Sequence, residues 1–184
     1  MARHLRIREQ VPLAPYTTLG LGGPARFFAG CRSDADLLEG VHLAKDLNLR
    51  LLFLGGGSNV VIADEGFDGL VLKIETRGTL RESTPEGIRL TVAAGERWDD
   101  FVCSCIDQGL AGVECLSGIP GSVGATPIQN VGAYGQEVSQ TIQEVSVMDV
   151  RTGDDVVFRN ADCRFAYRQS RFKHEDAGRY IVTS

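Results

Sequence analysis

The most informative stretch of this 184-residue chain is Leu116–Glu137, which reads LSGIPGSVGATPIQNVGAYGQE. It contains five glycines and two prolines, yet no charged side chain occurs between Glu114 and Glu137. A membrane-spanning helix would not be interrupted so often, and an ordinary surface loop would carry charge. We therefore predict a buried, irregular segment whose backbone N–H and C=O groups need partners, some of which a large bound ligand would supply.

A second glycine cluster, Gly55-Gly56-Gly57-Ser58-Asn59, follows the apolar run Leu51–Leu54. Glycines after a strand let backbone N–H groups converge on an anion, and Ser58 and Asn59 add side-chain donors for phosphate oxygens. The pattern is neither a Walker motif nor a Rossmann fingerprint. These residues taken alone leave two interpretations open, a phosphate-binding loop and a tight turn between strands.

Within the uncharged stretch, Gly118, Gly121 and Gly124 recur at every third residue. Such glycines allow an aromatic ring or a pyrophosphate to approach the main chain closely, and Gln129 and Asn130 carry donors and an acceptor for the edge of a heterocycle. The alternative is a glycine-rich loop packed only by its own chain.

The third element is Phe165–Lys173, which interleaves aromatic and basic residues. From Arg159 to Arg179 there are six Lys and Arg against three acidic residues, although the whole chain has a net charge of −5. This segment is a candidate for binding a phosphate or a carboxylate. A solvated basic surface explains the same composition.

Composition limits the class of protein. An apolar fraction of 43% is typical of a soluble globular protein, and the acidic balance argues against nucleic acid as a partner. Neither a signal peptide nor a long apolar run is present, so we expect a cytoplasmic protein without a membrane partner. Five cysteines without a secretory signal argue against a disulfide framework, and their spacing predicts no metal site.

Hydrophobic periodicity predicts the regular elements. In the first part we expect a helix over Ser33–Leu49 and strands over Leu51–Leu54, Val60–Ala63 and Leu70–Ile74, with a turn around Gly66–Gly69. The polar segment Glu75–Gly87 is predicted to join two domains. Beyond it we expect a strand from Ile88 to Ala94, a helix from Trp98 that Gly109 terminates, a hairpin of Ile142–Val150 with Val156–Arg159, and a strand at Tyr180–Ser184.

This order predicts a mixed α and β chain, with a small unit over residues 1–75 and a larger unit over residues 76–184. Because the sequence stops within an apolar strand, we expect the chain to be part of a longer protein.

Taken together, the motifs resemble the UDP-N-acetylenolpyruvoylglucosamine reductase family, the flavoenzymes of peptidoglycan precursor synthesis. The resemblance extends over nearly the whole chain, and its long central motif is highly specific. The matching segments are Tyr16–Gly23, Leu54–Asn59, Gly95–Trp98, Gly112–Glu114, Ile119–Ala125, Pro127–Gly135 and Tyr167–Lys173.

The resemblance implies an α+β, two-subdomain FAD-binding fold of the vanillyl-alcohol oxidase type, in which residues 1–75 and 76–184 hold noncovalent FAD between them. It places the pyrophosphate on Gly55–Asn59. The rest of the cofactor site is implied at Ser117, Gly118, Ile119, Gly121, Ser122, Ala125, Gln129, Asn130, Gly132 and Ala133.

The family reaction uses NADPH to reduce the flavin, which then passes hydride to the enolpyruvyl double bond of UDP-N-acetylglucosamine-enolpyruvate, giving UDP-N-acetylmuramate. Arg168 matches the catalytic arginine that polarises the substrate carboxylate, and Tyr167 matches a substrate-binding position. A cation there stabilises the negative charge that hydride addition builds up. We expect a monomer with no partners other than the UDP-sugar and NADPH.

The sequence departs from the family in one respect. Family members continue into a substrate-binding domain that supplies a serine or cysteine proton donor and a late glutamate, and neither has a counterpart here. We therefore expect the chain alone to be inactive in the full reaction. Two alternatives stay open: another FAD-linked oxidase or dehydrogenase of the same fold, in which Cys115 keeps covalent attachment possible, and a non-catalytic FAD-binding module.

Overall fold

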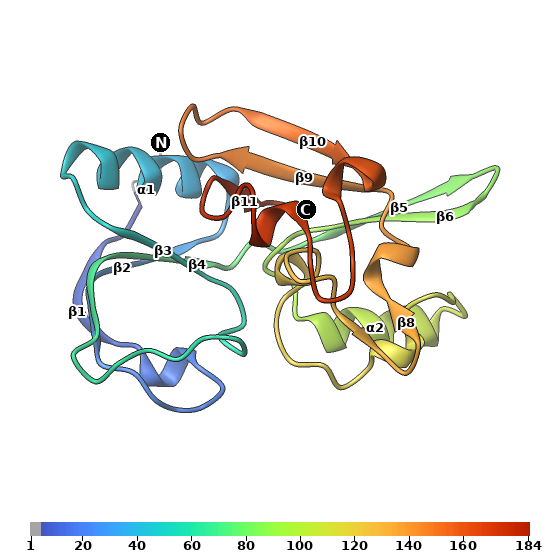
Figure 1. The fold of residues 1–184 in the computed structure, drawn as a ribbon, viewed down its shortest axis with the longest axis horizontal. Coiled ribbons are helices and arrows are strands. Elements are labelled where there is room, and N and C mark those ends of the chain that lie inside the picture. Colours follow the sequence, from blue (N-terminus) through green and yellow to red (C-terminus); the bar gives the residue numbers. More distant parts are fainter. Residues whose placement is uncertain (1–4) are drawn as a thin grey trace. The chain divides into compact units, whose positions relative to one another are not determined.

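The computed structural model describes residues 5–184, which divide into two compact units, one ending at Thr76 and the other spanning Arg77–Ser184. In the first unit a four-stranded sheet has the order β1-β2-β4-β3 (Figure 1). Strand β1 is antiparallel to β2, whereas β2, β4 and β3 run parallel to one another. Its elements are β1 (Arg8–Pro12), η1 (Ala14–Tyr16), β2 (Pro24–Cys31), α1 (Asp34–Asp46), β3 (Leu51–Leu54) and β4 (Phe67–Ile74).

Helix α1 lies along one face of this sheet (Figure 1). It begins at a capping box, in which the Ser33 hydroxyl accepts from the Asp36 N–H at 3.2 Å and the Asp36 carboxylate accepts from the Ser33 N–H at 3.1 Å. Leu37, Val41 and Ala44 are buried, as their spacing predicts. The helix was expected to extend to Leu49, but it ends at Asp46, and Leu47 beyond it is 56% exposed.

Strand β3 has the predicted bounds, but Val60–Ala63 is not a strand. Val60 and Ile62 pack against the core, while Val61 is 81% exposed. The alternation of buried and exposed side chains therefore belongs to a loop that packs on the core, not to a strand. The predicted turn at Gly66–Gly69 is also misplaced, since β4 already begins at Phe67. Gly69 serves close packing instead, because a Cβ there would lie 2.4 Å from the Arg50 carbonyl oxygen.

In the second unit β9 lies between β10 and β11 in a three-stranded antiparallel sheet, and the expected hairpin and final strand are both confirmed. Strands β5 and β6 form a separate hairpin with a projecting tip (Figure 1). The elements are β5 (Thr79–Thr84), β6 (Gly87–Val92), α2 (Trp98–Asp107), β7 (Gly132–Ala133), β8 (Gln136–Glu137), β9 (Glu144–Asp149), β10 (Asp155–Arg159) and β11 (Tyr180–Val182).

Strand β5 was predicted as part of a polar junction. Nearly all of its residues are exposed, so the strand carries no apolar alternation that a sequence could display. Strand β6 is also mostly exposed, and Ile88 faces solvent in part. Pairing between the two strands, rather than burial, defines this hairpin.

Helix α2 begins at Trp98 and is followed by Gly109 at a φ of +68°, as expected of a glycine that terminates a helix. The uncharged stretch packs onto this helix. Leu116 and Val131 join Trp98 and Val102 in one buried cluster, and the Trp98 indole N–H donates to the Leu116 carbonyl at 3.0 Å. Short 3-10 turns complete the unit at Glu114–Leu116, Val123–Ala125, Val138–Gln140, Asn160–Cys163 and Arg171–Lys173.

All five cysteines are free thiols, and Cys31, Cys105 and Cys163 are buried. Burial, with smaller contributions from Asp36 and Glu75, raises the pKa of Cys31 to about 12. Burial likewise raises the pKa of Cys163 to about 11. Within residues 5–184 no helix has the length and apolar character needed to cross a membrane.

Candidate functional site

The loop Gly55–Asn59 leaves the C-terminal end of β3 and is fixed at two carbonyl groups. The Lys73 ammonium donates to the Gly55 carbonyl at 2.6 Å, from a position in β4 that pairs with Leu54. The Thr18 N–H donates to the Gly57 carbonyl at 3.0 Å. The loop is therefore tied to β4 on one side and to the segment after η1 on the other.

Gly57 cannot be replaced without displacing the backbone. Its φ is +71°, and a Cβ at this position would lie 1.9 Å from the Tyr16 carbonyl oxygen. Within residues 5–184, the N–H groups of Gly56, Gly57 and Asn59 donate to no backbone carbonyl. Glycine backbone with unused N–H groups beside the end of a strand is suited to binding an anion.

The uncharged stretch pairs with the segment that leads into α2. Gly121 accepts from the Trp98 N–H at 3.1 Å, and the N–H groups of Val123 and Gly124 donate to Glu96 and Ala94, each at 2.9 Å. Gly124 is packed closely, because a Cβ there would lie 2.5 Å from the Ala94 Cβ. Four predicted cofactor residues lie between Ile119 and Ala125: Ile119, Gly121 and Ala125 are half-buried, and Ser122 is buried.

Ser117 and Gly118 were predicted to bind the cofactor, and both contact Asp99 in the first turn of α2. The Asp99 carboxylate accepts from the Ser117 hydroxyl at 3.1 Å and from the Gly118 N–H at 2.5 Å. The Gly118 N–H bond, followed by the Ser117 bond, holds the pKa of Asp99 below its ordinary value. Sequence reasoning missed Asp99, whose only signal is an acidic side chain in a first helical turn.

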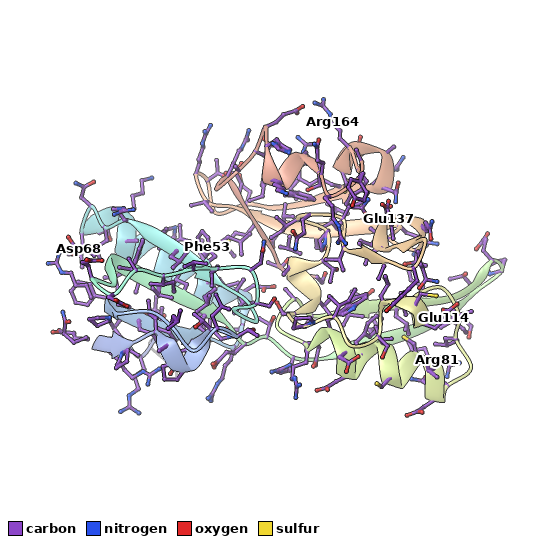
Figure 2. The ribbon with its side chains drawn as sticks, turned by 60° about the horizontal axis from the view of Figure 1, so that its bottom comes forward. Phe53, Asp68, Arg81, Glu114, Glu137 and Arg164 are labelled. Atoms are coloured by element: carbon purple, nitrogen blue, oxygen red, sulfur yellow. The ribbon has the colours of Figure 1, made fainter. Side chains whose placement is uncertain are left out.

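Asn130 holds the loop together rather than presenting its amide outward. Its side-chain NH2 donates to Glu137 at 2.8 Å and to the Ala166 carbonyl at 3.1 Å, and its oxygen accepts from the Ser139 N–H at 3.1 Å. Both amide hydrogens are thus used inside the unit, and the residue is 1% exposed. Of the predicted pair, Gln129 is the half-buried side chain left for the edge of a heterocycle. Glu137, the partner of Asn130, is labelled in Figure 2.

Arg168 lies at the tip of a tight turn. The turn is closed by reciprocal bonds between Ala166 and Gln169, at 3.1 and 3.0 Å, which leaves Tyr167 and Arg168 exposed at its end. Arg168 has a φ of +55°, a strained value for a residue with a side chain. Its guanidinium donates to the Gly132 carbonyl at 2.7 Å.

Three hydrogen bonds join this turn to the uncharged stretch. Besides the bonds from Arg168 to Gly132 and from Asn130 to Ala166, the Ser170 hydroxyl donates to the Ile128 carbonyl at 2.6 Å. Ser170 is 2% exposed, so its hydroxyl is a structural anchor. Two motifs that are 36 residues apart in the sequence therefore form one surface.

Much of the basic excess in this region is used within the unit. Arg171 pairs with Asp176 at 2.7 Å and stacks on the Phe158 ring, Arg164 pairs with Glu175, and the Lys173 ammonium donates to the Arg168 carbonyl at 3.0 Å. The segment is therefore more than a solvated basic surface. The predicted residues Gly55–Asn59 lie in the first unit, and the others lie in the second.

The fold and these loops define a flavin-binding domain. The FAD binding domain family matches residues 25–158, and the chain belongs to this family. Its cofactor is therefore FAD. The residues fit this cofactor, since the Gly55–Asn59 loop offers unused N–H groups and glycine backbone that a side chain at Gly57 would disrupt.

The resemblance to the UDP-N-acetylenolpyruvoylglucosamine reductases is also confirmed. The chain is 56% identical over 174 residues to the Streptomyces coelicolor reductase, a match that covers 95% of this chain and 44% of that protein. It is 53% identical over 175 residues to the Thermobifida fusca reductase, covering 95% and 49%. The chain spans about half the length of the curated relatives it matches.

Solved structures agree with this assignment. The crystal structure of UDP-N-acetylenolpyruvylglucosamine reductase from Thermus caldophilus has a TM-score of 0.74 at 28% identity, covering 97% of this chain and 60% of that one. A VAO-type flavoprotein from Myceliophthora thermophila shares the fold, with a TM-score of 0.60 at 18% identity over 74% of this chain and 27% of that one. The expected α+β fold of the vanillyl-alcohol oxidase type is therefore confirmed.

Proposed function

We propose that this chain is the FAD-binding part of a reductase that converts UDP-N-acetylglucosamine-enolpyruvate to UDP-N-acetylmuramate. The observation that carries the proposal is the attachment of the Arg168 turn to the uncharged stretch by three hydrogen bonds. The curated relatives named for this reaction support the choice of substrate. Bound FAD would supply hydride transfer, with NADPH as the source of the hydride.

The residues of this chain hold and orient the reactants. In the proposal the N–H groups of Gly55–Asn59 bind the FAD pyrophosphate, and the second unit binds the remainder of the cofactor. The residues proposed there are Ser117, Gly118, Ile119, Gly121, Ser122, Ala125, Gln129, Gly132 and Ala133, with Asn130 holding their loop in place.

Arg168 is the proposed catalytic residue, and Tyr167 beside it is the proposed substrate contact. Both are exposed at the turn tip, where a substrate carboxylate can reach them. A guanidinium paired with that carboxylate stabilises the negative charge that develops when hydride adds to the adjacent double bond. The Gly132 carbonyl orients the guanidinium by accepting a hydrogen bond from one of its N–H groups.

We also propose noncovalent FAD, a monomeric cytoplasmic protein, and no nucleic acid or membrane partner. The net charge of −5 supports the absence of nucleic acid. Cys115 is half-buried and its N–H donates to the Gln136 side chain at 2.9 Å, an arrangement that supplies no specific support for covalent attachment.

The test is a visible absorbance spectrum of the purified chain after incubation with FAD and desalting. Retained flavin bands that stay in solution after acid precipitation of the protein would support noncovalent binding. Flavin that precipitates with the protein would favour an oxidase-type covalent link. A folded protein that stays colourless would contradict the proposal for this chain.

The role of Arg168 is tested in a protein that carries out the whole reaction. There Arg168→Ala should leave FAD binding and flavin reduction by NADPH unchanged and slow the reoxidation by the enolpyruvyl substrate. Stopped-flow absorbance separates the two half-reactions. Equal losses in both would remove Arg168 from the catalytic step.

A further inference from the structure

Lys73 lies beside the proposed pyrophosphate loop, and its role is not explained by the motifs. It is near the end of β4, opposite Leu54 of β3, so the register of the parallel sheet places it at the start of the loop. Its side chain is half-buried, and its ammonium donates to the Gly55 carbonyl at 2.6 Å. This is a short bond from a charged donor, a class of hydrogen bond stronger than a neutral one.

Peptide geometry gives this contact a directional consequence. In a trans peptide the C=O of one residue and the N–H of the next point in opposite directions. Because the Lys73 ammonium holds the Gly55 carbonyl, the Gly56 N–H must point away from that ammonium group. Gly56 is exposed, and its N–H donates to no backbone carbonyl within residues 5–184.

A second carbonyl group of the loop, that of Gly57, is held in the same way. The Thr18 N–H holds the Gly57 carbonyl, which turns the following N–H, that of Ser58, away from Thr18. The loop is thus fixed through carbonyl groups on its protein side. Of the two anchors, only Lys73 is charged, so it also contributes a positive potential at the place where the proposed phosphates bind.

We propose that Lys73 is a positioning residue for the pyrophosphate of FAD. It holds the Gly55 carbonyl so that the Gly56 N–H faces the cofactor, and its charge favours the bound dianion. This inference rests on the proposed function, in which Gly55–Asn59 binds the pyrophosphate. It adds to that function a residue outside the glycine motif.

The experiment compares three variants of the full chain, stripped of bound flavin. Lys73→Met removes the charge and the donor, Lys73→Arg keeps both, and Lys45→Met removes an exposed lysine from the last turn of α1 in the same unit. FAD affinity is measured from the quenching of flavin fluorescence, and ADP, which carries the pyrophosphate without the flavin, is measured by competition. Thermal unfolding of each apo variant gives its stability.

We expect Lys73→Met to weaken FAD and ADP by the same factor, about tenfold, as for the loss of one charge-assisted hydrogen bond. Lys73→Arg should recover most of this affinity, and Lys45→Met should match the wild type. Added salt should weaken FAD binding less in Lys73→Met than in the wild type, because the variant lacks the lysine charge that salt screens in the wild type.

Wild-type FAD affinity in Lys73→Met would overturn the inference and leave the proposed function standing. A loss for FAD without a loss for ADP would also overturn it, since the effect would not act through the phosphates. A drop in thermal stability shared by Lys73→Met and Lys73→Arg, with FAD affinity unchanged, would assign Lys73 a purely structural role. A wild-type chain that binds no FAD would remove the proposed function itself, together with this inference.

Discussion

The guanidinium of Arg168 donates to the carbonyl oxygen of Gly132 across 2.7 Å, and so joins the tip of one turn to the centre of the uncharged stretch. Arg168 holds this position at a φ of +55°. A strained backbone persists only where the surroundings fix it, and such residues cluster at functional sites. The contact to Gly132 therefore helps to fix the position of the Arg168 guanidinium.

Replacing Arg168 should reveal the energetic cost of its positive φ. Glycine adopts a positive φ without strain, so Arg168→Gly should be more stable than Arg168→Ala by about 1 kcal/mol. Both variants should retain FAD equally. Urea unfolding measures the difference, and a more stable alanine variant would show that the backbone at this position is not strained.

Asn130→Ala should be among the most destabilising substitutions in the second unit. It leaves the Ala166 carbonyl and the Ser139 N–H without their side-chain partner and places alanine at a φ of +45°. The loss of three hydrogen bonds made by a buried side chain, together with the positive φ, predicts a loss of about 3 kcal/mol. Exposed Asn59→Ala is the control for urea unfolding; losses of similar size in both variants would contradict the role given to the Asn130 amide.

The fold should lose stability in acid through Asp149. Burial alone raises the pKa of this carboxyl, but the Arg151 N–H and the Arg179 guanidinium outweigh that effect and hold the pKa below its ordinary value of 3.8. A group whose pKa is lower in the folded state stabilises the protein above its unfolded-state pKa, and this stabilisation disappears as the pH falls through the folded-state value.

Urea unfolding at a series of pH values tests this expectation. The wild-type free energy of unfolding should fall as the pH drops below 3.8, and Asp149→Asn should show a flatter dependence in the same range. Parallel curves for the two proteins would assign the acid sensitivity to other carboxylates.

Thiol reactivity should follow burial. At mildly alkaline pH a disulfide reagent should modify exposed Cys103 quickly, whereas Cys31 and Cys163, with pKa values of about 12 and 11, should react only after unfolding. Mass spectrometry of the modified protein identifies the sites, and Cys103→Ser is the control. Rapid modification of Cys31 in the folded chain would show that its pocket opens.

Gly57 and Gly109 form a matched pair for testing the Gly55–Asn59 loop, because Gly109 follows α2 and lies outside the proposed cofactor site. Both have a positive φ, but a Cβ at Gly57 meets the Tyr16 carbonyl oxygen at 1.9 Å, whereas a Cβ at Gly109 meets nothing within 4 Å. Gly109→Ala should cost about 1 kcal/mol from the backbone alone and leave FAD affinity unchanged. Gly57→Ala should cost clearly more and lower FAD affinity, and equal effects of the two variants on unfolding and flavin binding would contradict the close packing at Gly57.

The local elements of the fold could be predicted because their signals are local. Ser33 and Gly109 mark where helices begin and end, and the apolar run Leu51–Leu54 is bounded by glycines. Val60–Ala63 was wrong because strand formation depends on a partner that the segment itself does not reveal. Strand β5 was missed because neither of its faces is buried.

The candidate site likewise contains residues that local sequence signals could predict and residues that they could not. The two glycine motifs could be identified from their composition, and Arg168 from the family resemblance. The partners that hold them could not, because Lys73, Asp99 and Ser170 each act on a backbone group far away in the sequence. Nothing in their own neighbourhoods indicates which carbonyl or N–H they will meet. Contacts of this kind follow from the folded chain alone.

The close approach of Gly57 to Tyr16 has a genetic consequence. Every amino acid that a single-nucleotide change can introduce at a glycine codon carries a Cβ, and at this position that atom would have to occupy the space of the Tyr16 carbonyl oxygen. We therefore expect no single-nucleotide missense change at codon 57 to be neutral. A library of random point mutants selected for flavin retention should contain only synonymous changes there, even as it accumulates substitutions at exposed Val61, four codons away.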